Sequence, residues 1–319
     1  MRFPSCRTQT NGLSTMRPAL VSIATIATIL SVSLCVCACL YLCLCVNTSP
    51  QDTMPATRTT AQKPHVVTPE QWSKKTTELT RSRDSNFRAR VLVYSYDDRL
   101  PRRRDLQALR EHNRSYCNTH GYRFVFEEEP VGDTSCYWVK VRRVREFLLT
   151  GEYDYVMWID SDVALTNDRV PVESLFSFYQ GAFLVKSTDH EVWSSEFNAG
   201  VFVVRDCALA REFLDECQWW GMYPAAKWVK GVTSHRWTCV GCGEWANSVE
   251  YEQGAAVRLL KLPKYAGGCI TFHWRIMQDH RLTAPYHQFQ PFCLHFAGSF
   301  KGSLDDFLSR TVQRTLQYN

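Results

Sequence analysis

The stretch DYVMWIDSDV (154–163) decides the fold. It is a short apolar run that leads into a turn with two carboxylates, a pattern typical of a buried strand with polar residues at its carboxyl end. Two more apolar runs precede it, RVLVYSY (90–96) and YRFVFEEE (122–129). Each gap between these three strands has the apolar spacing of a helix. The resulting β-α-β-α-β order predicts an α/β protein with a parallel, doubly wound sheet.

The two intervening helices have recognisable ends. DLQALREHNRSYCNTHGY (105–122) reaches Gly121 and WVKVRRVREFLLTGEY (138–153) reaches Gly151, and glycine is common just past a helix. Further strands are expected at 182–186, 200–205, 270–274 and 292–298, and further helices at 208–220 and 250–260. One α/β domain is therefore expected over 87–319. Ligands of open α/β sheets bind beyond the carboxyl ends of the strands. The turn at the end of DYVMWIDSDV (154–163) is therefore a candidate site.

An uncharged run from Ala19 to Val46 precedes this domain. A bilayer core needs about 20 helical residues, whereas a cleaved signal peptide has an apolar core of only about 7–15. We therefore expect a retained transmembrane signal-anchor over 19–46 behind a cytosolic tail over 1–18; a cleaved signal and a buried core helix are the alternatives. Residues 47–86 are rich in Thr, Ser, Pro and Gln and are expected to form a flexible stem.

The positive charge is concentrated before the anchor. The net charge of +5 falls to +2 once Arg2, Arg7 and Arg17 are set aside, and no acidic residue precedes the end of the anchor. The positive-inside rule makes the N-terminus cytosolic and the domain lumenal, as in a single-pass type II protein of the Golgi or ER membrane. A nucleic-acid binder would carry its basic residues on the folded domain, so nucleic acid is excluded as a partner. A homo-oligomer is compatible with the sequence.

Cysteine is abundant, with 14 residues in the chain. Eight of them follow the anchor: Cys117, Cys136, Cys207, Cys217, Cys239, Cys242, Cys269 and Cys293. A lumenal address permits disulfides, and an even count of eight is consistent with up to four of them. Cys239 and Cys242 have the spacing of half a zinc site, but no second CxxC is present in the sequence. A short-loop disulfide or free thiols are therefore favoured.

Asp160 and Asp162 stand at i and i+2 after the strand, where both can reach one hard divalent cation. Oxygen ligands suit Mn²⁺ or Mg²⁺, which keep positions open for phosphate oxygens. The motif HFAGSFK begins at His295, whose neutral imidazole can be a third ligand. Gly298 lets backbone approach a phosphate, and Lys301 can neutralise a diphosphate. The alternatives are a polar turn that caps a helix and a satisfied core histidine.

Six motifs in this order resemble those of a known family. They are Asn113-Arg114-Ser115-Tyr116 with His120-Gly121-Tyr122, Trp138-Val139-Lys140, Trp158-Ile159-Asp160-Ser161-Asp162, Asn198-Ala199-Gly200-Val201-Phe202, Glu252-Gln253, and His295-Phe296-Ala297-Gly298. The chain resembles the retaining glycosyltransferases of the GT-A fold that include the fungal Golgi α-galactosyl- and α-mannosyltransferases and the plant xyloglucan xylosyltransferases. The resemblance implies one GT-A domain with a UDP- or GDP-sugar as donor and a glycan or glycoprotein as acceptor.

The resemblance also implies roles for single residues. Asp160 and Asp162 would hold Mn²⁺ (or Mg²⁺) on the diphosphate, with His295 as the third protein ligand. Gln253 would lie near the anomeric carbon on the face opposite the leaving group, and Lys140 would point into the donor site. Lys301 would contact the phosphates, and Ser161 and Gly298 would belong to the same donor site. The sugar pocket would be lined by Asn198, Ala199 and Gly200. The alternatives are that Lys140 is a solvated helix lysine, that Gln253 is an exposed helix residue, and that Asn198 is a turn former.

One departure from the family concerns the acceptor side. The family commonly has a carboxylate directly after the Gln253 position, whereas here Gly254 follows and Glu252 precedes. It stays open which carboxylate, if any, assists the acceptor hydroxyl; Glu250 and Glu252 are the candidates.

The expected reaction is transfer of galactose, xylose or mannose to a glycan hydroxyl with retention of the anomeric configuration. The expected route is front-side attack, since the sequence places no clear nucleophile. The alternatives are a non-catalytic lumenal glycan-binding protein with a decayed donor site, and a metal-dependent phosphoesterase.

Overall fold

A computed structural model describes these residues of the chain: 65–81, 89–98, 104–129, 136–189, 196–221, 227–230, 237–240, 251–279, 290–297 and 303–309. The chain divides into two units, 1–58 and 59–319, and every described residue belongs to the second. The predicted tail (1–18) and anchor (19–46) lie outside the described residues. Among the helices in the described ranges, none is long and apolar enough to cross a membrane.

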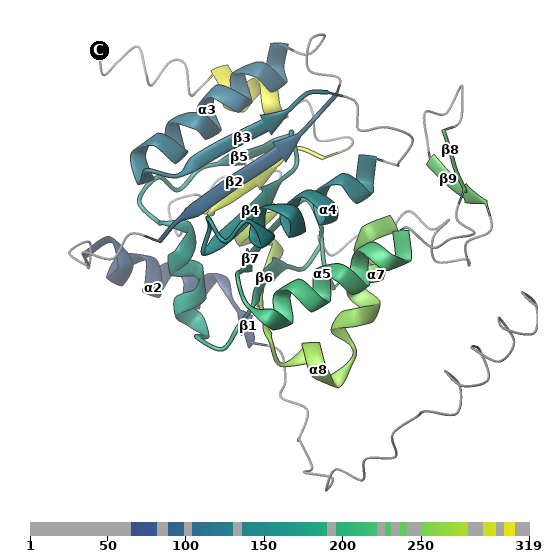
Figure 1. The fold of residues 1–319 in the computed structure, drawn as a ribbon. Helices are drawn as coiled ribbons and strands as arrows, with labels where there is room; N and C mark the ends of the chain where they lie inside the picture. The colour runs from purple at the N-terminus through teal and green to yellow at the C-terminus, as the bar shows by residue number, and fades with distance from the viewer. Residues whose placement is uncertain are drawn as a thin grey trace, which may run out of the picture. The chain divides into compact units, whose positions relative to one another are not determined.

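A seven-stranded sheet forms the centre of the second unit (Figure 1). Its strands, in order across the sheet, are β1 (His65–Val67), β10 (Cys269–Phe272), β6 (Leu184–Ser187), β7 (Val201–Arg205), β4 (Tyr155–Ile159), β2 (Val91–Tyr96) and β3 (Arg123–Glu127). The expected α/β class is confirmed. β7 runs antiparallel to both of its neighbours, whereas all other pairs are parallel. The prediction of a parallel sheet is therefore wrong at β7, because an apolar run looks the same in either chain direction.

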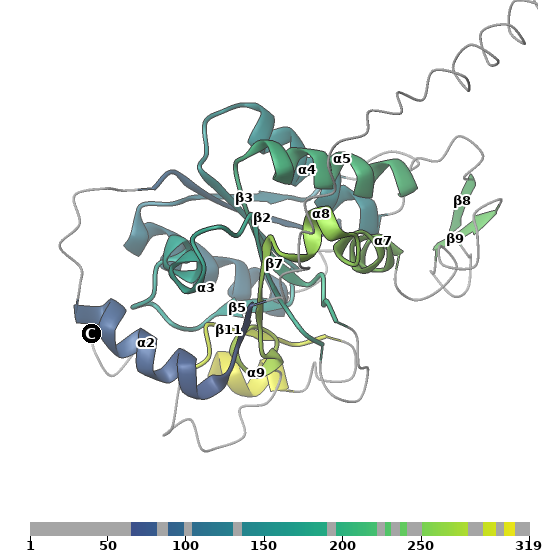
Figure 2. The same cartoon turned by 90° about the horizontal axis from the view of Figure 1, so that it is seen from below.

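Both faces of the sheet are buried. One face packs against α4 (Cys136–Leu149), α5 (Ala208–Gly221) and α7 (Tyr251–Leu260), and the other against α2 (Pro69–Arg81), α3 (Arg104–His120), η2 (Val172–Phe178) and α9 (Trp274–Met277) (Figure 2). Side chains alternate along the central strands: Leu92 and Tyr94 of β2 face the first group of helices, and Val91 and Val93 face the second. Strands buried on both faces have continuous apolar runs, which is why the sequence made them recognisable.

A short second sheet brings the last strand beside the turn that follows β4. β5 (Val163–Leu165) pairs antiparallel with β11 (Cys293–His295), and Val163 lies opposite His295. Asn113 of α3 holds β5: its amide donates to the Val163 carbonyl (2.7 Å), and its side-chain oxygen accepts from the Leu165 amide (2.9 Å). Asn113 thus has a structural role, and β11 carries His295 to the carboxyl end of β4.

Residues 65–81 belong to the fold, although the sequence assigned them to the stem. β1 pairs in parallel with β10, and α2 packs on the sheet through Trp72, which is fully buried. The Trp72 indole N–H donates to the carbonyl of Gln290 (2.9 Å). The predicted stem over 47–86 is therefore wrong over this segment. The Trp72 side chain anchors α2 to the sheet. The sequence did not indicate this helix, because one large apolar residue in a polar stretch produces no periodic pattern.

The remaining elements are β8 (Lys227–Lys230) and β9 (Trp237–Val240), which pair antiparallel, α8 (Pro263–Ala266), and helical residues 303–309. β8 and β9 lie between α5 and α7 in the chain.

Five of the eight cysteines that follow the predicted anchor are free thiols: Cys117, Cys207, Cys217, Cys269 and Cys293. Cys136, Cys239 and Cys242 lie outside the residues whose side chains are described. These five therefore form no disulfide, and the expectation of up to four disulfides is wrong for the cysteines in the described part of the chain. Four of the free thiols are buried in the core, where cysteine packs as a small apolar side chain.

Candidate active site

The site lies in the turn that joins β4 to β5. Backbone hydrogen bonds fix this turn from two sides. The Asp160 N–H donates to the carbonyl of Gly200 just before β7 (2.8 Å), and the Phe296 N–H just after β11 donates to the carbonyl of Asp162 (2.9 Å). Both aspartates are therefore attached to ordered backbone at the carboxyl end of a central strand, where the sequence predicted a site.

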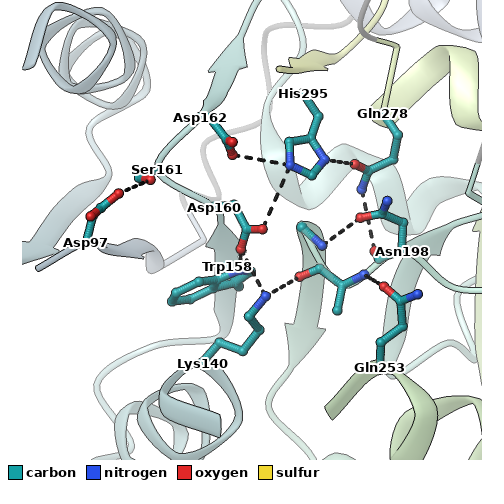
Figure 3. Close-up of polar contacts among 12 residues, drawn as sticks. Asp97, Lys140, Trp158, Asp160, Ser161, Asp162, Asn198, Gln253, Gln278 and His295 are labelled. Atoms are coloured by element: carbon teal, nitrogen blue, oxygen red, sulfur yellow. Dashed lines mark hydrogen bonds and ion pairs between the residues drawn. The ribbon is translucent and has the colours of Figure 1, made fainter. Parts of the chain in front are cut away.

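Asp160, Asp162 and His295 come together as predicted, with one ligand atom from each within 4.8 Å of the others (Figure 3). His295 Nε2 lies 3.3 Å from Asp162 Oδ1 and 3.8 Å from Asp160 Oδ2. Burial opposes a charge on His295, but the two carboxylates outweigh burial and raise its pKa. Within the described ranges this is the one group of three or more His, Cys, Asp or Glu side chains that could hold a metal ion.

A second contact orients the imidazole. His295 Nδ1 lies 2.6 Å from Gln278 Oε1, and the Gln278 amide donates in turn to the carbonyl of Asn198 (3.5 Å). An oxygen acceptor requires a proton on Nδ1, so in the neutral imidazole the lone pair of Nε2 faces the aspartates. The histidine is thus set in the tautomer that a metal ligand needs.

The donor set fits a divalent cation. Two carboxylates and one imidazole from a turn and a neighbouring strand suit Mn²⁺ or Mg²⁺. Gly200 leaves the room that this arrangement needs, because a Cβ there would lie 2.3 Å from His295 Cε1 and 2.9 Å from Asn198 Oδ1. The sequence placed Gly200 in the sugar pocket; the structure adds that its missing side chain is what admits the histidine.

Lys140 of α4 reaches into the same site and is buried. Its Nζ lies 3.0 Å from Asp160 Oδ1, 3.0 Å from Glu252 Oε1 and 3.2 Å from the carbonyl of Ala199. Burial works against its charge, but Asp160 and Glu252 outweigh burial and hold its pKa above that of an ordinary lysine. Burial raises the pKa of Glu252 against the opposing pull of Lys140. The alternative of a solvated helix lysine is therefore wrong.

The loop 198–200 is held from three sides. Asn198 donates its amide to Asp189 Oδ1 (3.0 Å), and its side-chain oxygen accepts from the Gly200 N–H (2.8 Å). Gln253 Oε1 accepts from the Ala199 N–H (2.9 Å), which ties α7 to the loop. Asn198 is both a turn former and part of the site, and Gln253 is half-buried rather than an exposed helix residue.

The remaining predicted residues differ in outcome. The Ser161 hydroxyl donates to Asp97 Oδ2 (2.5 Å) on the side away from His295 (Figure 3). Its side chain is therefore used to join the turn to the end of β2. Gly298 and Lys301 lie outside the described residues.

Three polar residues at the site were not predicted: Asp97, Asp189 and Gln278. Asp97 directly follows β2, and Asp189 follows β6 by two residues. Asp160 was predicted because it follows a predicted strand. Asp97 and Asp189 also follow predicted strands, so the same signal could have indicated them. Gln278 follows the short helix α9, and no sequence pattern pointed to it.

Comparison with known proteins gives partial matches to glycosyltransferases. No family model matches the chain. It is 30% identical over 129 residues to the "Probable glycosyltransferase 7" of Oryza sativa subsp. indica, and 27% identical over 124 residues to the "Putative glycosyltransferase 7" of Arabidopsis thaliana. These alignments cover 37% and 35% of this chain and 27% of each relative. The chain thus spans about a quarter of the length of these relatives.

Among solved structures, the chain is similar to a glycosyltransferase involved in the glycosylation of the major capsid of PBCV-1. The sequence identity is 20% and the TM-score 0.49, over 69% of this chain and 99% of that one.

Proposed function

We propose that the protein is a metal-dependent glycosyltransferase that moves a sugar from a nucleotide diphosphate to a hydroxyl of a glycan. The observation that carries the proposal is the convergence of Asp160, Asp162 and His295 at the carboxyl end of β4. The partial similarity to plant glycosyltransferases supports the same class. The donor (a UDP- or GDP-sugar of galactose, xylose or mannose), the retention of configuration and the use of Mn²⁺ belong to this proposal.

The chain's own residues have separable tasks in this reaction. A divalent cation on Asp160, Asp162 and His295 would supply Lewis-acid stabilisation of the diphosphate leaving group. The Lys140 ammonium fixes the orientation of the Asp160 carboxylate through Oδ1. Gln253 holds the loop at Ala199, next to the carboxylates. Preorganised contacts of this kind lower the barrier because they need no rearrangement as charge develops.

The arrangement of Glu252 bears on the acceptor side. Its side chain is buried and paired with Lys140, so we exclude Glu252 as the group that receives the acceptor proton. Glu250 lies outside the described residues. We propose front-side attack, in which the departing phosphate oxygen takes the proton of the acceptor hydroxyl.

Two rival functions are weaker. A two-metal phosphoesterase usually needs ligands for a second cation, and the described part of the chain holds one candidate group. A glycan-binding protein with a decayed donor site does not need oriented metal-ligating side chains. Here Gln278 contacts His295, Lys140 contacts Asp160, and Gly200 leaves room for the imidazole.

The test is the Mn²⁺-dependent release of UDP or GDP from a panel of nucleotide sugars by the full chain. We expect one donor to be hydrolysed slowly and faster with a glycan acceptor, and Asp160→Asn to lose both activities. Asp168→Asn is the matched control, because Asp168 is an exposed aspartate shortly after the same turn. Full release by Asp160→Asn, or hydrolysis of simple phosphate esters instead, would contradict the proposal.

The membrane anchor over 19–46, the type II topology and the Golgi or ER location are likewise proposals. They rest on the length of the uncharged run and on the arginines that precede it.

A further inference from the structure

The Asp160 carboxylate uses its two oxygens for two different contacts. Oδ1 accepts from Lys140 Nζ (3.0 Å) and from Trp158 Nε1 (2.7 Å), whereas Oδ2 is turned toward His295 Nε2 (3.8 Å). Lys140 therefore orients the ligand without taking the oxygen that faces the other two ligands. Its charge nevertheless lies next to the place of a divalent cation, which it would repel.

Glu252 stands on the other side of this lysine. It comes from the first turn of α7, a different helix from that of Lys140, and both side chains are buried. The Glu252 Oε1 to Lys140 Nζ distance is 3.0 Å, as short as that from Lys140 to Asp160. Glu252 is not in the candidate metal-ligand group, and its carboxylate pairs with the lysine.

The charges of this cluster can be compared with and without Glu252. Asp160, Asp162 and Glu252 against Lys140 leave two negative charges, which match a divalent cation. Without Glu252 one negative charge remains, and the lysine charge acts on the cation unopposed. Lys140 and Glu252 are buried, so little water screens the charge of either side chain.

On the basis of the proposed function, we propose that Glu252 is a positioning residue that cancels the charge of Lys140, so that Lys140 can orient Asp160 without weakening metal binding. This role differs from assistance to the acceptor hydroxyl, for which Glu252 was a candidate. It also differs from a purely structural role, because it predicts that removing the lysine charge repairs the loss of the glutamate.

The test is Mn²⁺ binding to the full chain without nucleotide. Binding is measured as the decrease of the electron paramagnetic resonance signal of free Mn²⁺. We expect Glu252→Gln to weaken binding by roughly tenfold or more, because the ammonium is then unopposed. The double variant Lys140→Met with Glu252→Gln is expected to bind within about threefold of wild type, because it keeps two negative charges and Trp158 still holds Asp160.

The outcomes separate this inference from the proposed function. Unchanged binding in Glu252→Gln, or a double variant that binds as weakly as Glu252→Gln, would overturn the inference while leaving the metal site in place. A wild-type chain that binds no Mn²⁺ would overturn both. If Glu252→Gln alone does not fold, the double variant still decides, since a large loss of binding in it contradicts the charge argument.

Discussion

Two buried lysines lie in the described part of this domain, and they carry opposite pKa shifts. Lys140 is 5% exposed and Lys186 of β6 is 7% exposed, so burial alone does not distinguish them. Lys140 has carboxylates on two sides, and its pKa is raised. Lys186 donates to a backbone carbonyl, that of Glu196 (2.5 Å), and burial lowers its pKa to about 8. The charge of a buried amine thus depends on its partners, and Asp160 and Glu252 supply two carboxylates at Lys140.

The largest expected effect comes from removing the paired lysine. Lys140→Met leaves Glu252 buried without its counter-charge, and breaking one side of a buried pair costs about 3–5 kcal/mol. Urea unfolding at neutral pH measures the change in the free energy of unfolding. Adding Glu252→Gln to this variant should recover most of the loss. A loss below about 1 kcal/mol in the single variant would show that the pair is not buried as described.

Removing the other buried lysine should have the opposite sign. At neutral pH the protonated Lys186 is held in the core at a cost, so Lys186→Met is expected to stabilise the protein by about 1–3 kcal/mol. The folded pKa of about 8 lies below the ordinary 10.5, so the unfolded state binds more protons between these values. Wild-type stability from this residue therefore rises with pH across that window.

The measurement is urea unfolding of wild type and Lys186→Met at about pH 7 and about pH 10, where the difference between them should shrink. A variant that is less stable than wild type at neutral pH, or a difference that does not change with pH, would contradict this account.

The smallest effect is expected at an exposed lysine with the same kind of partners. Lys264 of α8 forms ion pairs with Glu212 (2.9 Å) and Glu216 of α5, but its side chain is 41% exposed. Solvent and salt screen such pairs. Lys264→Met should therefore leave the unfolding midpoint unchanged within error. A clear loss of stability there would mean that pairing matters independently of burial.

The sequence predicted the parts of the fold that repeat a pattern locally. β2, β3 and β4 are apolar runs buried on two faces, and the two helices between them end near Gly121 and Gly151, which have positive φ. The docking of α2 was missed, because it depends on Trp72 reaching Gln290 far along the chain. The direction of β7 was missed as well, since a continuous apolar run does not indicate the direction of its strand.

The candidate site shows the same limit. Asp160, Asp162 and His295 were predicted because their motifs stand at strand ends and resemble a family. The roles of Gln278 and Glu252 depend on contacts between elements distant in sequence, such as the 2.6 Å contact from Gln278 to His295. A sequence pattern names the residues that could bind, whereas their orientation and the balance of their charges appear only once the elements are packed.

The claim that Asp160, Asp162 and His295 hold a divalent cation is tested most directly by the stoichiometry of Mn²⁺ binding. The account predicts about one Mn²⁺ per wild-type chain, none in Asp162→Asn, and unchanged binding in the exposed control Asp168→Asn. Equal Mn²⁺ binding by wild type and Asp162→Asn would contradict it.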